Sequence, residues 1–206
     1  KILNDIDLEI KKGERIGIYG ESGSGKSTFL NLLTMLIKPS SGKFYIDDQI
    51  IDTQEKIRLY QNKITFISQD TFLFEDSIKN NIILNNNDNF DEKKFNYALQ
   101  FSQLKDIINK FEKGTDYKVG SHSRKISSGQ RQRIVLARAI YNAKDILVLD
   151  EATNALDEEN ETKIFENLHK LDKELTIIIV SHNIKNLKKC DKILEVKNKV
   201  LNIKNN

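Results

Sequence analysis

The sequence Gly20-Glu21-Ser22-Gly23-Ser24-Gly25-Lys26-Ser27-Thr28 fits the pattern G-x-x-x-x-G-K-[ST]. It lies between the apolar run Arg15-Ile16-Gly17-Ile18-Tyr19 and the run Phe29-Leu30-Asn31-Leu32-Leu33, which indicates a strand, a loop and the start of a helix. Glycines allow the backbone to turn tightly and to point consecutive N–H groups inward, and the helix N-terminus adds partial positive charge. The stretch therefore predicts a phosphate-binding loop, with a Gly/Ser-rich turn as the alternative.

Two side chains at the end of this phosphate loop (residues 20–28) add charge and metal-binding chemistry. Lys26 is long enough to reach the outer phosphates of a nucleotide as a point charge. The Ser27 hydroxyl can complete the coordination of a Mg²⁺ ion, which prefers oxygen ligands. We therefore expect phosphates and Mg²⁺ to bind here, and we assign nucleotide binding to Gly20, Glu21, Ser22, Gly23, Ser24, Gly25, Lys26, Ser27 and Thr28.

The composition limits the class of protein. The chain has 206 residues, which is enough for one well-packed domain or for one domain with a small lobe. Its 33 basic and 30 acidic side chains nearly balance, so charge gives no reason to expect a nucleic-acid surface. The longest apolar runs, such as residues 175–180, have the length of a strand and fall far below the roughly 20 residues that cross a bilayer. The single cysteine, Cys190, excludes an internal disulfide.

Alternation of apolar and polar residues predicts an antiparallel β layer. Residues 2–10 have the period of a half-buried strand, and residues 11–14 are typical of a hairpin turn. Residues 43–52 alternate again and predict a hairpin that turns at Asp47 and Asp48. We expect this layer to lie beside the strand that leads into the phosphate loop.

Strands that alternate with helices predict an α/β fold. Continuous apolar runs indicate strands buried on both faces, and right-handed crossovers through helices then give a mainly parallel core sheet flanked by helices. An amphipathic helical region between two of these strands would form a separate lobe. The predicted strands are 64–68, 145–151 and 176–180, and the predicted helices are about 26–37, 91–113 and 158–171.

Four polar residues lie at or just beyond the carboxyl ends of predicted strands of this sheet: Gln69, Asp150, Glu151 and His182. Ligands of such sheets bind beyond the carboxyl ends of the strands, where the phosphate loop also emerges. We therefore expect these residues to share one site with the loop.

Each of these residues has a chemical role that competes with a structural one. Asp150 would hold Mg²⁺, with a helix N-cap as the alternative. Glu151 is the candidate general base for a water that attacks the γ-phosphate, with a first-turn acid of a helix as the alternative. His182 can donate a hydrogen bond to the γ-phosphate or to that water, although a lone histidine is more often structural. Gln69 can offer its amide oxygen to the metal.

Residues 127–130 form a second candidate anion site, because a hydroxyl, a glycine and exposed N–H groups stand at a predicted helix start. In that helix Arg131, Arg133 and Arg138 are predicted on one side and apolar residues on the other. About a hundred residues separate the two anion sites. The hypothesis is that two copies bind head to tail and enclose two ATP molecules, each between the phosphate loop of one copy and residues 127–130 of the other.

Together these motifs resemble the nucleotide-binding domain of ATP-binding cassette (ABC) transporters over nearly the whole chain. The phosphate loop resembles the Walker A motif, and Ile146-Leu147-Val148-Leu149-Asp150-Glu151 resembles Walker B with its catalytic glutamate. Ile126-Ser127-Ser128-Gly129-Gln130 resembles the signature L-S-G-G-Q, with Ser128 in place of the first glycine and Ile126 in place of leucine. Asn154-Ala155-Leu156-Asp157 looks like the D-loop, Gln69 the Q-loop glutamine and His182 the switch histidine.

The resemblance implies a P-loop NTPase fold, with a mainly parallel core sheet flanked by helices, an antiparallel β layer and a helical subdomain that carries the signature. Residues 1–68 and 145–206 would form a RecA-like core with the antiparallel layer, and about 70–144 the Q-loop and helical subdomain. ATP and Mg²⁺ are the implied cofactors. The implied catalytic residues are Glu151, His182 and Gln69; the further nucleotide-binding residues are Ser127, Ser128, Gly129, Gln130 and Asp157; the metal-binding residues are Ser27, Gln69 and Asp150.

Residues 69–82 are similar to the exporter pattern Q-x-x-x-L-F-x-x-S-I-x-x-N-I, which implies ATP-driven export or flipping of a substrate across a membrane. The implied partners are a second copy in a head-to-tail dimer and a transmembrane domain that is absent from this chain and fused to it in the native protein. We expect the domain itself to be soluble and to work at the cytoplasmic face of the plasma or inner membrane. The alternatives are a soluble ATPase of the same family that acts on nucleic acid and a separate importer subunit, and the exporter-like residues 69–82 disfavour both.

Overall fold

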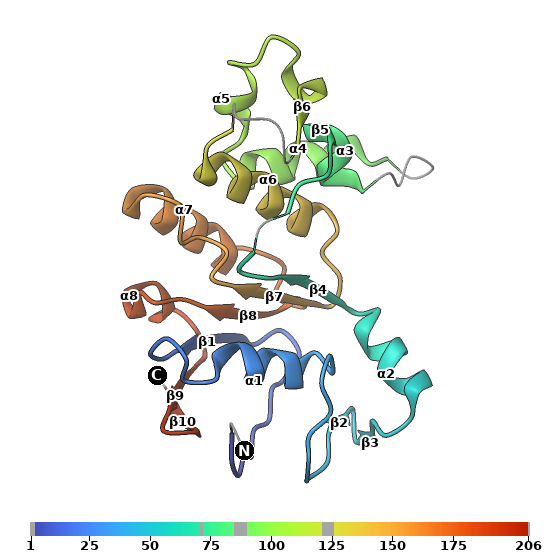
Figure 1. The fold of residues 1–206 in the computed structure, drawn as a ribbon, viewed down its shortest axis with the longest axis vertical. Helices are drawn as coiled ribbons and strands as arrows, with labels where there is room; N and C mark the ends of the chain where they lie inside the picture. The colour runs from blue at the N-terminus through green and yellow to red at the C-terminus, as the bar shows by residue number, and fades with distance from the viewer. Residues whose placement is uncertain (1–2, 71, 85–89, 121–125, 206) are drawn as a thin grey trace. The chain divides into compact units, whose positions relative to one another are not determined.

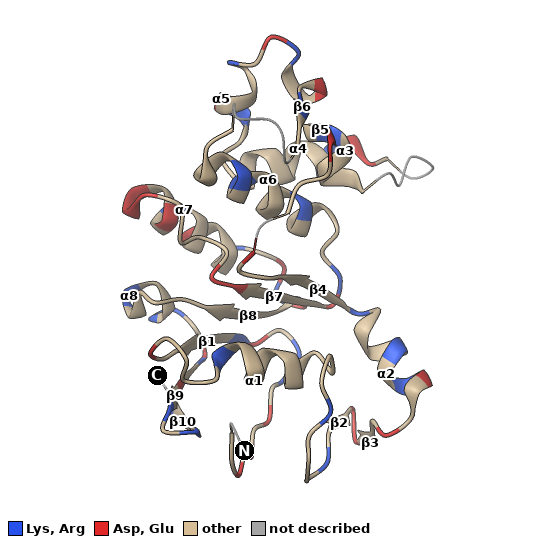
Figure 2. Ribbon diagram, in the orientation of Figure 1, with Lys and Arg blue, Asp and Glu red and all other residues tan. Residues whose placement is uncertain are grey.

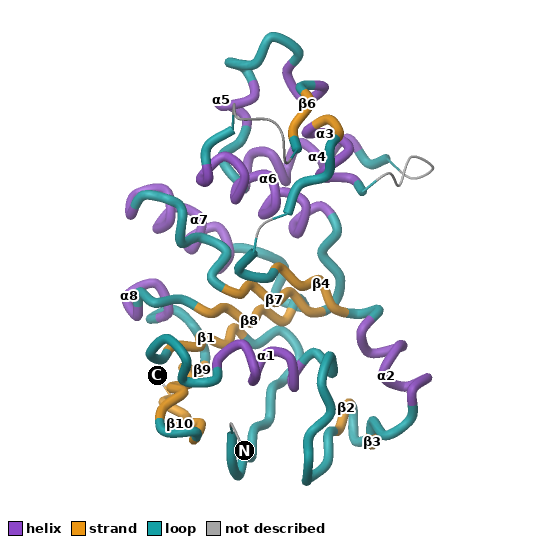
Figure 3. The backbone as a smooth tube through the Cα atoms, in the orientation of Figure 1, coloured by secondary structure: helices purple, strands orange, loops and turns teal. Residues whose placement is uncertain are grey.

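The computed structural model describes residues 3–70, 72–84, 90–120 and 126–205. These residues divide into two compact units, whose elements are labelled in Figure 1 and coloured by type in Figure 3. The sheet unit comprises the described residues of Lys1–Thr65, Lys144–Asp150 and Lys173–Asn206. The helical unit comprises the described residues of Phe66–Ala143 and Glu151–Asp172.

A six-stranded sheet organises the sheet unit, with the strand order β10-β9-β1-β8-β7-β4. The β1 strand pairs in parallel with both β8 and β9, β7 pairs in parallel with β8, and β10 is antiparallel to β9. The predicted mainly parallel α/β sheet is therefore confirmed. The strands are β1 (Arg15–Tyr19), β4 (Ile64–Ile67), β7 (Ile146–Asp150), β8 (Thr176–Val180), β9 (Lys192–Lys197) and β10 (Val200–Asn205).

Sequence analysis assigned no structure to the two strands at the end of the chain. The β9 strand contains three charged residues and the apolar residues Ile193, Leu194 and Val196, and those three apolar side chains are buried. Asn198 and Lys199 join β9 to β10, and both have positive φ angles, 51° and 67°. That geometry is typical of a two-residue type I′ hairpin turn, which matches the twist of paired strands.

The predicted N-terminal strand is wrong for the residues that the structure describes. Residues 3–10 contain no strand, although Asn4 N donates a hydrogen bond to Lys199 O at 2.9 Å. Asp5 has a φ of 48°, which interrupts an extended conformation. The alternation of apolar and polar residues is therefore not enough to make this segment pair as a strand. Residues 11–14 do form the predicted turn, through Glu14 N and Lys11 O at 3.1 Å, but it joins no hairpin.

The second predicted hairpin is present as a separate two-stranded sheet of β2 (Tyr45–Ile46) and β3 (Gln49–Ile50). Its turn lies at Asp47 and Asp48, with φ angles of 48° and 63°. Both residues adopt the left-handed conformation that a type I′ turn requires, and aspartate tolerates that conformation better than most residues.

The helix after the phosphate loop, α1 (Lys26–Leu33), ends earlier than predicted. Thr34 is its C-cap and donates its hydroxyl to Leu30 O at 2.8 Å, and Met35 then turns with a φ of 54°. The next helix, α2 (Gln54–Gln61), begins at the N-cap Thr53. Met35 packs with two buried side chains of α2, Ile57 and Tyr60.

Helix α8 (Ile184–Leu187) and Cys190 pack against β1 at Gly17. A Cβ on Gly17 would lie 3.0 Å from Leu187 Cβ and 3.2 Å from Cys190 Sγ, so a larger residue would push these groups away. Burial, together with the Asp191 carboxylate, raises the pKa of the Cys190 thiol to about 12. The cysteine is a buried packing residue.

The helical unit is built around α6 (Ser128–Tyr141), which packs against α3 (Ile78–Ile83) and α4 (Glu92–Phe101). The single helical region predicted at 91–113 is divided, because Gln103 has a φ of 56° between α4 and the next helix. The remaining elements are β5 (Asp76–Ser77), α5 (Lys105–Ile108), the 3₁₀ turn η2 (Gly114–Asp116), β6 (Lys118–Val119), which pairs with β5, and α7 (Glu158–His169).

Two arginines of α6 contact other segments of the helical unit. Arg133 is buried, and Arg138 donates from Nε to Asn81 O at 2.7 Å and from Nη1 to Phe72 O at 2.9 Å. Arginine can satisfy several carbonyl oxygens at once through its planar group of donors. The two arginines therefore tie α6 to neighbouring segments of the helical unit.

The hydroxyl of Tyr60 provides a test of the packing between α1 and α2. It donates to Leu33 O at 2.8 Å, which satisfies a carbonyl at the end of α1. We expect Tyr60→Phe to lower the free energy of unfolding by about 1 kcal/mol, the usual net value of one hydrogen bond. Urea unfolding measures this, with Tyr45→Phe as the control because Tyr45 is exposed. Equal stability of the two variants would contradict the prediction.

Candidate functional site: the phosphate loop and the signature helix

The phosphate loop leaves β1 and enters α1 through Gly25, whose φ is 108°. The loop folds around the side chain of Lys26, which is buried and donates from Nζ to Gly20 O at 2.8 Å and to Glu21 O at 3.0 Å. Two backbone carbonyls thus hold the ammonium group at the loop, and a phosphate oxygen can compete for the same donor. The predicted strand, loop and helix are confirmed.

Two observations show that the loop fits a phosphate. A Cβ on Gly20 would lie 2.5 Å from Val196 O and 2.8 Å from Ser24 Oγ, so only glycine allows this close backbone approach. Ser24 Oγ is buried and has no hydrogen-bond partner in the structure. A buried hydroxyl without a partner is costly, and an anionic oxygen in the loop would satisfy it. The donor set therefore suits the phosphates of a nucleotide.

Sheet pairing brings Asp150 and His182 to the edge of the sheet where this loop begins. Val180 of β8 is in register with Ile18 of β1 on one side and with Asp150 of β7 on the other. His182 follows Val180 by two residues and is exposed, whereas Asp150 is 6% exposed. Asp150 is not a helix N-cap, because it ends β7 and the next helix, α7, begins at Glu158.

The residues of this edge can contribute oxygen ligands to Mg²⁺. Ser27 lies in the first turn of α1 and is exposed, and Asp150 supplies a carboxylate. Among the described residues, no group of three or more His, Cys, Asp or Glu side chains could hold a metal. Mg²⁺ often uses only one or two protein ligands when nucleotide phosphates complete its coordination, so Ser27 and Asp150 fit that mode of binding.

The signature residues form the start of α6 in the helical unit. Ser127 is the N-cap, and its Oγ accepts a hydrogen bond from Gln130 N at 3.2 Å. Gln130 Oε1 in turn accepts one from Ser127 N at 3.0 Å, which completes a capping box. Ser127 and Ser128 are exposed at this 14-residue helix, so the predicted helix start is confirmed.

Glu151 lies in a turn outside any helix, so the alternative of a first-turn acid is wrong. It has a φ of 53° and is 6% exposed. Its carboxylate Oε2 accepts a hydrogen bond from Asn154 Nδ2 at 2.7 Å, and its backbone carbonyl accepts one from Gln132 Nε2 at 3.2 Å. The left-handed conformation of a non-glycine residue costs free energy and persists only where neighbouring groups hold it.

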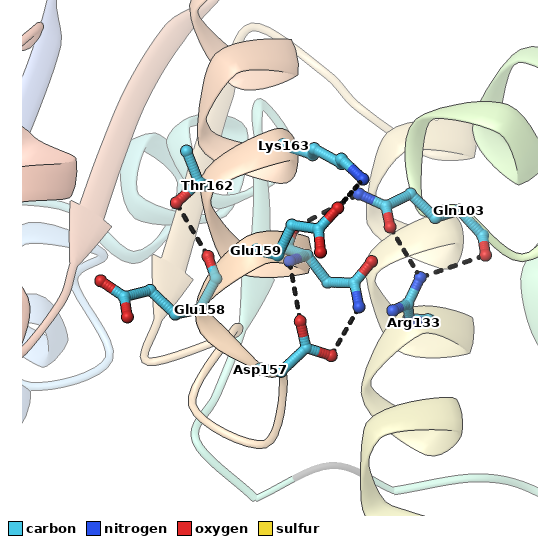
Figure 4. Close-up of polar contacts among 8 residues, drawn as sticks. Gln103, Arg133, Asp157, Glu158, Glu159, Thr162 and Lys163 are labelled. Atoms are coloured by element: carbon cyan, nitrogen blue, oxygen red, sulfur yellow. Dashed lines mark hydrogen bonds and ion pairs between the residues drawn. The ribbon is translucent and has the colours of Figure 1, made fainter.

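Asp157 is the N-cap of α7 (Figure 4). Its Oδ1 accepts from Asn160 N at 3.0 Å and its Oδ2 from Asn160 Nδ2 at 2.5 Å. These bonds from Asn160, with a smaller contribution from Arg133, hold the pKa of the Asp157 carboxyl below its usual value. Gln103 connects Arg133 and Asn160, the two residues that act on Asp157. Its side chain accepts a hydrogen bond from Arg133 Nη1 at 3.0 Å and donates one to Asn160 O at 3.3 Å. Further acidic residues lie in the first turn of α7 (Figure 2), where negative charge stabilises the N-terminal end of a helix.

The predicted site residues fall into two groups. The sheet unit contains the phosphate loop, Asp150 and His182. The helical unit contains Gln69, the signature residues, Glu151 and Asp157. Gln69 follows β4 by two residues and is exposed.

Two residues that contact Glu151 were not predicted as site residues. Gln132 was not singled out at all, and Asn154 was noted only as part of the D-loop. The signal for Gln132 was an amide within a stretch of α6 whose other residues are almost all buried, because a buried amide needs specific partners. The signal for Asn154 was a short amide three residues after a candidate base.

A parallel sheet with a phosphate loop at its edge and acidic residues after its strands defines a nucleotide-binding α/β domain. The sequence profile of the family described as "ABC transporter" matches residues 3–154. The chain therefore belongs to the ABC transporter family, as its nucleotide-binding ATPase domain.

Relatives with curated names are similar over nearly the whole chain. The chain is 38% identical over 195 residues to the "ATP-dependent lipid A-core flippase" of Pectobacterium atrosepticum, covering 94% of this chain and 33% of that protein. It is also 38% identical over 195 residues to the protein of the same name from Neisseria meningitidis serogroup B, covering 94% of this chain and 31% of that protein. The chain thus spans about a third of the length of these relatives.

A solved structure with a similar fold is that of a bacterial Atm1-family ABC exporter with ATP bound. Its TM-score to this chain is 0.87 at 32% sequence identity, and the match covers 98% of this chain and 35% of that chain. Within the described part of this chain, no helix is both long and apolar enough to cross a membrane.

Lys26 provides a direct test of the phosphate loop. We expect Lys26→Ala to weaken ATP binding about 10- to 100-fold, because a charged hydrogen bond to phosphate contributes about 1.5–3 kcal/mol. Titration with a fluorescent ATP analogue measures the affinity, and thermal unfolding checks that the loss of two loop hydrogen bonds leaves the fold intact. Lys43→Ala is the matched control, because Lys43 is exposed and lies outside residues 20–28. Unchanged affinity in Lys26→Ala would contradict the assignment.

Proposed function

We propose that this chain is the ATP-hydrolysing domain of an exporter or flippase and that a transmembrane domain is fused to it in the native protein. One observation carries this proposal. The matches to the flippases cover 94% of this chain but only about a third of each flippase. The similarity to an Atm1-family exporter supports the same assignment. The domain would work at the cytoplasmic face of the membrane, where ATP is present.

The reading frame upstream of Lys1 tests the fused arrangement at little cost. We expect it to continue without interruption and to encode several apolar spans of about 20 residues each. A native protein that lacks such spans would favour a separate importer subunit or a soluble ATPase instead.

The proposed chemistry assigns a role to each group of residues. The phosphate loop binds the phosphates of ATP, and Lys26 directs its ammonium group at the outer phosphates. Ser27, Asp150 and Gln69 would hold Mg²⁺, which when bound neutralises charge on the phosphate oxygens.

Hydrolysis then requires a water in line with the γ-phosphate. The Glu151 carboxylate accepts the proton of that water, and His182 donates a hydrogen bond to the γ-phosphate. The bond from Asn154 to Glu151 Oε2 still leaves acceptor capacity on the carboxylate, because an ionised carboxylate has about four lone-pair sites.

A second copy would complete each nucleotide site. The phosphate loop and the signature helix belong to different compact units, and each presents a helix start. In a head-to-tail dimer with two-fold symmetry, Ser127, Ser128, Gly129 and Gln130 of one copy would bind the ATP that the phosphate loop of the other copy holds. Asp157 would lie in the same interface. ATP would thus stabilise the dimer, and hydrolysis would loosen it.

Glu151→Gln tests the general base. The substitution keeps the size of the side chain but removes the proton acceptor, so we expect ATP binding to persist while turnover falls by about 100-fold or more. Because hydrolysis no longer opens the dimer, a dimer that contains ATP should accumulate. Steady-state ATPase assays and sedimentation with Mg-ATP measure both effects in the full native protein. Normal turnover would remove Glu151 as the base.

Ser127→Arg tests the dimer. The long cationic side chain at the exposed N-cap should block closure of the two copies while a monomer still binds ATP. Loss of the cap alone costs about 1 kcal/mol, so Ser127→Ala is the control that removes the cap without adding bulk. Sedimentation in the Glu151→Gln background, with and without Mg-ATP, compares the two. Equal ATP-dependent dimerisation of Ser127→Arg and Ser127→Ala would count against the interface.

A further inference from the structure

Gln132 connects the second turn of α6 to the turn that contains Glu151. Its side chain is 5% exposed. Its Oε1 accepts a hydrogen bond from Ala155 N at 2.8 Å, and its Nε2 donates one to Glu151 O at 3.2 Å. A single buried amide therefore satisfies one donor and one acceptor of the backbone between β7 and α7, and both bonds lie within the helical unit.

The turn held by Gln132 is short and strained. Glu151 has a φ of 53°, and its carbonyl accepts from Asn154 N at 3.3 Å as well as from Gln132. The Asn154 side chain also donates a hydrogen bond to the Glu151 carboxylate. Asn154 thus contacts both the backbone carbonyl and the carboxylate of Glu151, so a change in the turn would move the carboxylate.

The first turn of α6 approaches the same segment. A Cβ on Gly129 would lie 3.1 Å from Ala155 O, which leaves little room for any larger residue. Gly129 and Gln132 are three residues apart and so share one face of the helix. That face packs against the turn at two positions. Gln130, by contrast, uses its side chain in the capping box of its own helix.

We propose that Gln132 is a positioning residue for Glu151, through which the signature helix sets the placement of the general base. The proposal rests on the proposed role of Glu151 in hydrolysis. A shift of the signature helix is transmitted by the Gln132 amide to the carbonyl of Glu151, and the carboxylate moves with it. Gln132 itself contacts neither ATP nor the attacking water in this scheme.

Gln132→Met in the full native protein tests the proposal. Methionine has a similar length and a high helix propensity, but it can replace neither hydrogen bond. We expect kcat for ATP hydrolysis to fall about tenfold or more, because small displacements of a catalytic group have large effects on rate. We expect KM for ATP to change less than about twofold, because the nucleotide-binding residues are untouched.

A double-mutant cycle separates positioning from general loss of structure. In the Glu151→Gln background there is no base to position, so adding Gln132→Met should leave the residual turnover unchanged. If Gln132→Met lowers that residual turnover by the same factor as in the wild type, the proposal is overturned. It is also overturned if the single variant has normal kcat. Full turnover of Glu151→Gln alone would instead refute the proposed base, whatever Gln132 does.

Asn142 supplies the matched control, because it caps the other end of α6. Its Nδ2 donates to Ile82 O and to Arg138 O, both at 2.8 Å, so Asn142→Leu also removes two bonds to backbone carbonyls. We expect this control to lower Tm without changing kcat per folded molecule.

Should Gln132→Met fail to fold, Gln132→Glu keeps an acceptor for Ala155 N but has no donor for Glu151 O. It should show the same fall in kcat, and normal kcat in this variant would overturn the proposal.

Discussion

The pairing of β1 with strands on both of its sides is the constraint on which the phosphate loop depends. Because β8 and β9 flank β1 in parallel, the backbone of β1 is fixed up to the residue where the loop begins. The carbonyl of Val196, near the end of β9, then approaches Gly20 so closely that a Cβ would not fit. The loop is therefore formed by the sheet rather than by its glycines alone, and Lys26 closes it from within.

A second constraint acts where β7 ends. Asp150 is the last residue paired with β8, and Glu151 turns the chain out of the sheet in a left-handed conformation. Two adjacent acids thus have different surroundings, since the first belongs to the sheet unit and the second is held by side chains of the helical unit. This division gives a physical basis for the separate roles that we propose, one in metal binding and one in proton transfer.

Much of the fold followed from local sequence patterns, and the errors have a common cause. Residues 146–150 and 176–180 form strands within the predicted ranges, because strands that are buried on both faces of a parallel sheet have near-continuous apolar sequences. Residues 3–10 alternate equally well but form no strand, whereas the charged β9 pairs with β1. Alternation indicates that a segment can pair, but whether it pairs depends on a neighbouring strand being available. The contacts of Arg138 depend on packing in the same way, since its partners are carbonyl groups of distant segments.

The sequence alone determined the phosphate loop, the strands at residues 146–150 and 176–180, and the acids at the end of β7, because each of these depends on residues that are adjacent in the chain. Only the tertiary structure decided that Gln132 holds the Glu151 turn, that Ser24 Oγ is buried without a partner, and that Gly20 lies against Val196. Such contacts join residues that are distant in the chain or depend on burial. Neither can be known before the chain is packed.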